Sequence, residues 1–321
     1  HECTKTSRIH PTGRNAHASP TFKLENLVQS TYLTHNHKTM IETDKNYFSE
    51  LEQTVSNAIK EDLGTGDVTV ELIDHTMKAK AQVISRDDAT VCGIPWVNEV
   101  FFQIDPSLTI LWQVKDGDLI EANQLLLTIE GCARSILTGE RVALNFLQTL
   151  SATATQTRYY NQLISHTEAQ LLDTRKTIPG LRRAQKYAVS CGGGSNHRMG
   201  LFDAFLIKEN HIMACGSIAN AVNRAKNLYP DRRIEIEVEN MQEFSEAVAA
   251  EPHWIMLDNF STEEMTAAVV SLNKDISLEA SGGIESEQDL IAIAETGVQY
   301  ISVGALTKHL HAVDLSLRLI E

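Results

Sequence analysis

The sequence predicts a two-domain α/β protein in which a small α+β domain precedes a parallel (β/α) barrel. From residue 170 onward, short apolar segments typical of strands alternate with segments of helical periodicity, as in repeated βα units. Before residue 150, the two kinds of segment are mixed without this alternation. A third observation is that the barrel strands end in polar, charged or glycine residues, where a barrel enzyme builds its active site.

Residues 1–39 differ from the rest of the chain. They are rich in Ser, Thr and His, contain few acidic residues and show no clear apolar period. We expect a leader or an added, dispensable segment. A transit peptide is the alternative, although no clean amphipathic helix supports it.

The first domain is predicted from elements of mixed type. Phe48, Leu51 and Val55 lie at helical spacing and predict a helix over residues 47–60. The other expected elements are strands at 79–85 and 108–114, a helix near 95–102, two short strands within 116–130, and a long helix over 135–160 that bridges the two domains.

The second domain is predicted from strict alternation. Closure of its strands into a barrel is the most economical arrangement. The expected strands are 170–174, 204–208, 233–239, 254–258, 276–281 and 299–303, and the expected helices include 181–191, 217–228, 241–250, 262–272 and 285–295.

Composition restricts the kind of partner. The chain has 321 residues and a net charge of −14, which argues against nucleic acid or an anionic membrane surface as a partner. No run approaches eighteen apolar residues, so we expect no membrane span. The five cysteines are odd in number and form no C-x-x-C pair, which favours a reduced, cytoplasmic setting.

Cations are nevertheless concentrated in one stretch, residues 171–211. Arg and Lys near glycine-rich turns predict a binding place for a polyanionic small molecule, and the N–H groups of residues 192–194 are expected to form an anion-binding concavity. A solvated basic face is the alternative. The cations are Arg175, Lys176, Arg182, Arg183, Lys186, His197, Arg198 and Lys208.

Carboxylates follow on the next strands. Period-two alternation places Glu235, Glu237 and Glu239 on one face, where they require cations such as Lys208 and Lys176, or a divalent metal. Glu237 and Asp258 offer the hard oxygen ligands that suit Mg²⁺ shared with substrate phosphates. A structural network of ion pairs is the alternative interpretation.

Glycine corners follow the last two strands, at residues 281–284 and 302–305. Each corner opens onto an expected helix N-terminus, and such loops form the usual phosphate site of these barrels.

Taken together, these residues resemble the quinolinate phosphoribosyltransferases, from about Glu61 to the C-terminus. The motifs are spaced along the whole of that length, which makes the resemblance specific. They are Glu61-Asp62-Leu63-Gly64 with Asp67 and Thr69, Gly139-Glu140-Arg141 with Ala143-Leu144-Asn145, residues 173–198, 206–211 and 235–240, Leu257-Asp258-Asn259-Phe260, and residues 302–307.

The resemblance implies transfer of ribose 5-phosphate from phosphoribosyl pyrophosphate to quinolinate, with loss of CO₂. It also implies an N-terminal α/β sandwich domain (40–149), a C-terminal incomplete parallel (β/α) barrel (150–309), and a final segment (310–321) that packs back on the first domain. The family's sites are completed across a homodimer.

Roles follow by motif. Arg141 looks like the arginine that enters the neighbouring subunit's site. Arg175, His197 and Arg198 look like the clamp on the quinolinate carboxylates, and Lys176 and Lys208 bridge toward the phosphates. The resemblance implies catalytic roles for Lys176, Lys208, Glu237 and Asp258, Mg²⁺ ligation by Glu237 and Asp258, and a 5-phosphate pocket at Ser281, Gly282, Gly283 and Gly304.

The chain departs from the family at two places. It has Ser151-Ala152-Thr153-Ala154-Thr155 where Ser-Gly-Ile-Ala-Thr is frequent, and Glu209 where Asp is common. These two differences put in doubt only the local packing near the domain junction.

Three rival functions remain at this point. A lyase would use Lys208 as a Schiff-base lysine, but it has no need of three cations for a dicarboxylate. A transferase for another pyridine carboxylate, such as nicotinate, would need fewer cations. A non-enzymatic anion-binding barrel would show no turnover.

Overall fold

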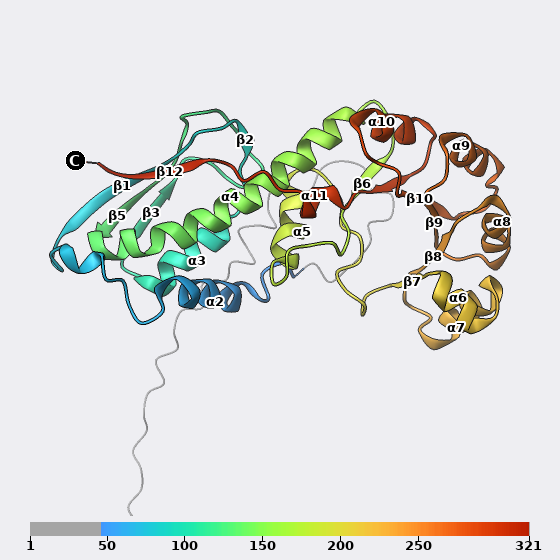
Figure 1. Ribbon diagram of the computed structural model, residues 1–321, viewed down its shortest axis with the longest axis horizontal. Helices are drawn as coiled ribbons and strands as arrows, with labels where there is room; N and C mark the ends of the chain where they lie inside the picture. Colours follow the sequence, from blue (N-terminus) through green and yellow to red (C-terminus); the bar gives the residue numbers. More distant parts are fainter. Residues whose placement is uncertain (1–45, 321) are drawn as a thin grey trace, which may run out of the picture. The chain divides into compact units, whose positions relative to one another are not determined.

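The computed structural model describes residues 46–320, which contain two main sheets (Figure 1). The expectations for residues 1–39 lie outside the described residues. The chain begins the first sheet, builds the second sheet, and then returns to the first with its last strand.

The first sheet is antiparallel, with the order β12-β1-β5-β3. Strand β12 (Leu315–Ile320) pairs with β1 (Lys78–Ser85), so the end of the chain completes the sheet of the N-terminal half. Strands β5 (Leu125–Cys132) and β3 (Thr109–Trp112) complete it, and β2 (Ala89–Thr90) and β4 (Leu119–Ile120) form a separate small ladder.

Three helices pack with this sheet around one apolar core, which gives the N-terminal half a two-layer architecture. They are α2 (Leu51–Leu63), α3 (Ile94–Ile104) and α4 (Ala133–Leu163). A short 3₁₀ turn, η1 (Val70–Leu72), follows α2. Trp96 of α3 and Leu127 of β5 are almost wholly buried there.

Helix α4 belongs to both halves of the molecule. Its first half packs in the N-terminal core through residues such as Leu147, while Ile164, just after its end, lies in the second core. Its hydroxyl groups also hold the β2 region, because Ser151 Oγ accepts the N–H of Cys92 and Thr155 Oγ1 accepts that of Thr90. Segment 151–155, where this chain departs from the family pattern, therefore contributes to the packing of α4 on the β2 region.

The second sheet is parallel, with six strands in the order β6-β11-β10-β9-β8-β7. Its strands are β6 (Gln170–Leu172), β7 (Phe205–Ile207), β8 (Ile234–Val238), β9 (Trp254–Asp258), β10 (Ser277–Ser281) and β11 (Tyr300–Ser302). Its helices are α5 (Arg182–Cys191), α6 (Glu209–Cys215), α7 (Ile218–Leu228), α8 (Met241–Ala250), α9 (Thr262–Ser271), α10 (Glu287–Glu295) and α11 (Ala305–Lys308).

Several of these helices begin at a polar residue that satisfies a free N–H group of the first turn. Ser217, Asn240, Ser261 and Ser286 each accept the N–H three residues further on. These caps explain why the helices start where the sequence predicts.

The sheet does not close, so the expectation of full closure is wrong. Strands β6 and β7 are its edges. The outer edge of β6 pairs with Ser195 instead of β7: Ser195 donates its N–H to Leu171 at 2.8 Å and accepts that of Asp173 at 3.2 Å. The incomplete barrel implied by the family resemblance is therefore correct.

The two faces of the sheet differ in chemistry. Ile236, Leu257 and Leu278 face the helices and form the apolar core. By alternation, Glu235 and Glu279 point to the opposite, inner face, where both are fully buried. This polar interior supports the site described below.

No helix in residues 46–320 is long and apolar enough to cross a membrane.

Candidate active site

The register of the second sheet aligns its carboxyl ends. Ser281 pairs with both Asp258 and Ser302, and Ser302 pairs with Leu172, the residue before Asp173. On the other side, Ile207 pairs with Ile236, so Lys208 comes level with Glu237. The predicted strand-end residues therefore lie along one rim, as parallel pairing requires.

The acidic part of this rim consists of Glu237 and Asp258, with Lys208 beside Glu237. Lys208 Nζ makes an ion pair with the Glu237 carboxylate. Burial and the negative charge of Asp258 raise the pKa of Glu237, against the effect of Lys208. The side-chain amide of Asn259 donates to Asp258 at 3.0 Å. Lys208 pairs with Glu237, and no ion pair of Asp258 is found within residues 46–320, so the position can accept further positive charge.

Arg175 and Arg198 form the basic part. Burial lowers the pKa of Arg198, and the charge of Arg175 lowers it further. Among residues 46–320, neither guanidinium lies within 4 Å of a carboxylate, and the buried Nε of Arg198 has no hydrogen-bond partner. The charges of Glu235 and Asp203 act on Arg198 from further away. Two neighbouring cations without a directly paired carboxylate are an arrangement suited to an anionic ligand.

His197 is held inside the barrel. Its Nε2 lies 2.9 Å from a Glu235 oxygen and 3.3 Å from a Glu279 oxygen, and its Nδ1 accepts the N–H of Arg198 at 2.8 Å. Arg233 adds a cation 3.6 Å from Glu235. The ring is only 6% exposed, so its nitrogens face protein groups.

The charges of His197, Glu235 and Glu279 shift one another's pKa. Burial lowers the pKa of His197, but the charges of Glu235 and Glu279 outweigh it and raise that pKa to about 10. Burial and the charge of Glu235 raise the pKa of Glu279 to about 7. The cluster therefore keeps at least one proton at neutral pH, on His197 Nε2 between the two carboxylates.

A second buried pair holds the backbone of His197. Asp173 and Lys186 form a fully buried ion pair. Asp173 accepts the N–H of His197 at 3.0 Å, and Lys186 donates to the carbonyl of His197 at 3.1 Å. Asn196 donates to Asp173 at 2.6 Å. Residue 197 is thus fixed through its backbone as well as its ring.

The glycine run has a different purpose from the one expected. The N–H groups of Gly192, Gly193 and Gly194 donate to carbonyls of α5, so the predicted anion-binding concavity is wrong. A Cβ on Gly192 would lie 2.4 Å from the carbonyl oxygen of Ala154. The run therefore allows the end of α5 to pack closely on α4.

The two glycine corners lie on the rim. Gly282 has φ +82°, and a Cβ there would meet the Asn259 side chain at 2.1 Å. A Cβ on Gly304 would lie 3.1 Å from Cδ of Lys176, so Lys176 lies beside this corner rather than beside the glutamates of β8. Ser281 and Gly283 lie at the first corner, and Gly283 has open space beside it.

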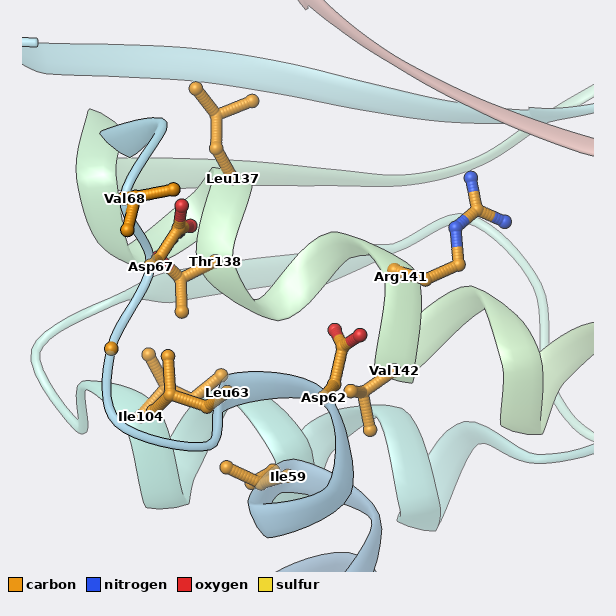
Figure 2. A pocket seen from close by; sticks show the side chains of 11 residues that line it. Ile59, Asp62, Leu63, Asp67, Val68, Ile104, Leu137, Thr138, Arg141 and Val142 are labelled. Carbon is orange, nitrogen blue, oxygen red and sulfur yellow. Dashed lines mark hydrogen bonds between the residues drawn. The ribbon is translucent and has the colours of Figure 1, made fainter. Parts of the chain in front are cut away.

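Arg141 lies elsewhere, on α4 in the N-terminal half (Figure 2). It is exposed and lines a pocket of about 290 Å³ with Asp62 of α2 and Asp67, whose carboxylate accepts a hydrogen bond from Thr138. No strand-end residue of the barrel lines this pocket. The structure thus groups the other predicted site residues on the rim and keeps Arg141 apart.

Sequence reasoning counted Arg182 and Lys186 in the basic stretch and placed Asp173 at a strand end, but gave none of the three an individual role. It assigned no site role to Glu279. The signal for Glu279 was its place between the apolar Leu278 and Ala280, the alternation already seen in β8.

An incomplete parallel barrel whose rim joins unpaired arginines to lysines, carboxylates and glycine corners defines an enzyme for anionic small molecules. The sequence comparisons give the family. Residues 67–151 match the family model for the N-terminal domain of quinolinate phosphoribosyl transferase, and residues 153–318 match that for its C-terminal domain. The chain belongs to the quinolinate phosphoribosyltransferase family.

Relatives agree along most of the chain. A probable nicotinate-nucleotide pyrophosphorylase [carboxylating] of Bacillus subtilis is 38% identical over 84% of this chain and 93% of the relative. A chloroplastic nicotinate-nucleotide pyrophosphorylase [carboxylating] of Arabidopsis thaliana is 38% identical over 84% and 83% of the two chains.

Solved structures agree as well. That of the nicotinate-nucleotide pyrophosphorylase from Francisella tularensis has a TM-score of 0.82 and 46% identity, over 89% of this chain and 100% of the other. Human nicotinic acid phosphoribosyltransferase shares the fold alone, with a TM-score of 0.56 and 13% identity over 84% and 74% of the two chains.

Proposed function

We propose that this enzyme transfers the phosphoribosyl group of phosphoribosyl pyrophosphate to the ring nitrogen of quinolinate and removes the 2-carboxylate. The products are nicotinate mononucleotide, pyrophosphate and CO₂, a step of de novo NAD biosynthesis. The observation that carries the proposal is the pair Arg175 and Arg198, two neighbouring guanidinium groups that form no ion pair within 4 Å among the described residues.

Quinolinate has two adjacent carboxylates, and each can accept a forked pair of hydrogen bonds from a guanidinium. Arg175 and Arg198 supply that function at the rim. His197 would support the clamp from below, since its ring contacts Glu235, Glu279 and the N–H of Arg198.

The donor substrate would lie along the rest of the rim. Lys176 beside Gly304 would bind phosphate oxygens, and the corner of Ser281, Gly282 and Gly283 would receive the 5-phosphate. Lys208 would contact the pyrophosphate from its position beside Glu237.

Glu237 and Asp258 fit a Mg²⁺ ion, because they are neighbouring oxygen ligands whose mutual repulsion is only partly offset by Lys208. The bound ion would neutralise charge on the pyrophosphate leaving group. The Mg²⁺ requirement is part of the proposal.

The chemistry requires mainly orientation and charge. As the bond from C1 of the ribose to pyrophosphate breaks, positive charge develops on the sugar, and the ring nitrogen of quinolinate forms the new bond. Loss of the 2-carboxylate as CO₂ leaves an electron pair at ring carbon 2, next to the cationic nitrogen. A proton then adds to this carbon. The cations of the rim hold both anionic reactants while this happens.

Arg141 supports a homodimer with shared sites. It lies on α4, its pocket contains no residue of the barrel rim, and no carboxylate within residues 46–320 pairs with it. We propose that it completes the site of a partner subunit. The cysteines at positions 92, 132, 191 and 215 are free thiols, which is compatible with the predicted cytoplasmic location.

Two rival functions are less well supported. A Schiff-base lyase needs the Nζ of Lys208 free to attack a carbonyl, but this atom is engaged in an ion pair with Glu237. A nicotinate transferase has one acceptor carboxylate and would leave one of the two arginines without an anion.

The test uses purified protein with Mg²⁺, phosphoribosyl pyrophosphate and quinolinate. We expect nicotinate mononucleotide and CO₂ in equal amounts, and no product when Mg²⁺ is chelated. Turnover of nicotinate in place of quinolinate would favour the monocarboxylate function, and no product from either acid would contradict the proposal.

A further inference from the structure

Two arginines occupy an unfavourable place at the start of α5. Arg182 and Arg183 are its first two residues, and the first turn contains no acidic side chain. The N-terminus of a helix carries partial positive charge, so cations there are destabilising by some tenths of a kcal/mol each. Cations at this unfavourable position indicate that Arg182 and Arg183 have a role in the tertiary structure.

Arg183 has a structural role away from the rim. Its Nη1 donates to the carbonyl of Asn46 at 2.8 Å, and its Nε lies 3.4 Å from Glu50. These contacts attach the segment before α2 to α5.

Arg182 instead contacts the two loops that carry the anion-binding arginines. Its Nη2 donates to the carbonyl of Arg175 at 3.4 Å, and its Nη1 donates to the carbonyl of Met199, the residue after Arg198, at 3.3 Å. Its Nε donates to Thr177 Oγ1 at 3.2 Å. All three nitrogens of the guanidinium are thus engaged by the chain itself.

The geometry of guanidinium matters for this bridge. Its planar fork holds two acceptors at a fixed separation, whereas an ammonium group on a flexible stem does not. The loop of Arg175 and the loop of Arg198 come from opposite ends of α5, and these contacts of Arg182 join them directly.

We propose that Arg182 is a positioning residue that sets the separation of Arg175 and Arg198, and with it the preference for an acceptor with two adjacent carboxylates. The inference rests on the proposed function, because it takes Arg175 and Arg198 as the acceptor clamp. Arg182 itself need not touch the acceptor.

The experiment compares Arg182→Lys with the matched control Arg183→Lys. Both variants keep the charge at the start of α5, and only the first loses the fork between the two loops. Calorimetry in the full-length protein measures affinity for quinolinate, for the monocarboxylate picolinate (pyridine-2-carboxylate), and for phosphoribosyl pyrophosphate.

We expect Arg182→Lys to weaken quinolinate binding about tenfold, because a small misplacement of one clamp residue affects a ligand held at two points. Picolinate, which needs one arginine, and phosphoribosyl pyrophosphate are expected to change less than about twofold. Arg183→Lys is expected to change none of the three affinities.

Equal losses for quinolinate and picolinate would overturn the inference, because a direct contact or a general loss of structure acts on both acids alike. Unchanged quinolinate affinity would also overturn it. If Arg182→Lys does not fold, Arg182→Gln, which keeps two donors, is measured in its place by the same criteria. Failure of the wild-type protein to bind quinolinate would instead contradict the proposed function.

Discussion

Asp173 and Lys186 form an ion pair from which water is excluded, since both side chains are 0% exposed. Burial raises the pKa of Asp173 and lowers that of Lys186, and each partner opposes the effect on the other. The pair also binds both backbone polar groups of His197. The pair therefore holds in place the backbone segment that carries Arg198.

Lys186→Met is expected to destabilise the protein by about 3–5 kcal/mol, because removal of one partner leaves a buried, unpaired carboxylate. Urea unfolding measures the difference in free energy. Lys226→Met serves as the control: Lys226 also lies on a helix and donates to a carbonyl, that of Ala250, but has no buried carboxylate as a partner. Similar losses for the two variants would contradict the importance of the pair.

Arg198→Ala is expected to weaken quinolinate binding about a hundredfold and phosphoribosyl pyrophosphate binding far less, because Arg198 belongs to the acceptor end of the rim. Calorimetry with each ligand separately measures both effects. Equal losses for the two ligands would contradict the assignment of Arg198 to quinolinate.

Arg141→Ala and Lys208→Ala are each expected to abolish activity alone. Mixed dimers of the two variants contain one intact site, built from the Lys208 of one subunit and the Arg141 of the other. Random exchange should restore about one quarter of wild-type activity. No recovery after subunit exchange, verified by a mass difference between the subunits, would show that Arg141 does not act in trans.

Glu279→Gln is expected to change how stability depends on pH. The pKa of Glu279 is raised in the folded protein from an ordinary value near 4.5 to about 7. A carboxyl group with a raised pKa stabilises the fold fully below about pH 4.5, and this contribution is lost as the pH rises through 7. The loss amounts to about 3 kcal/mol for a shift of this size.

Glutamine at position 279 is neutral at every pH, so the variant should lack this loss. Urea unfolding of both proteins at pH 5 and pH 8 gives the comparison. Parallel changes in the two proteins would show that Glu279 does not take up a proton on folding.

The repeating pattern of the barrel was predictable because it is local. Each strand and its following helix can be recognised from a few neighbouring residues, and caps such as Ser217 and Asn240 mark where the helices begin. Parallel strands place their carboxyl ends at one edge, so the positions of Lys208, Glu237 and Asp258 followed from the strand limits alone.

The support beneath the rim was not predictable in the same way. His197, Glu235 and Glu279 come from three separate segments, and only the folded chain brings their side chains together. The glycine run at residues 192–194 was interpreted wrongly for a different reason. Glycine permits close approach of any group, and the local sequence does not say whether the group is an anion or the neighbouring helix α4.

The pairing of β12 with β1 has a consequence for biosynthesis. Strand β1 leaves the ribosome before the barrel, but Ile320, which pairs with Lys80 of β1, is made only after the whole barrel. The barrel, whose strands are consecutive along the chain, can assemble first, while one edge of β1 stays exposed to other nascent chains. A nascent polypeptide released before residue 315 would therefore have an open sheet edge, and chaperones or proteases would encounter it as unfinished protein.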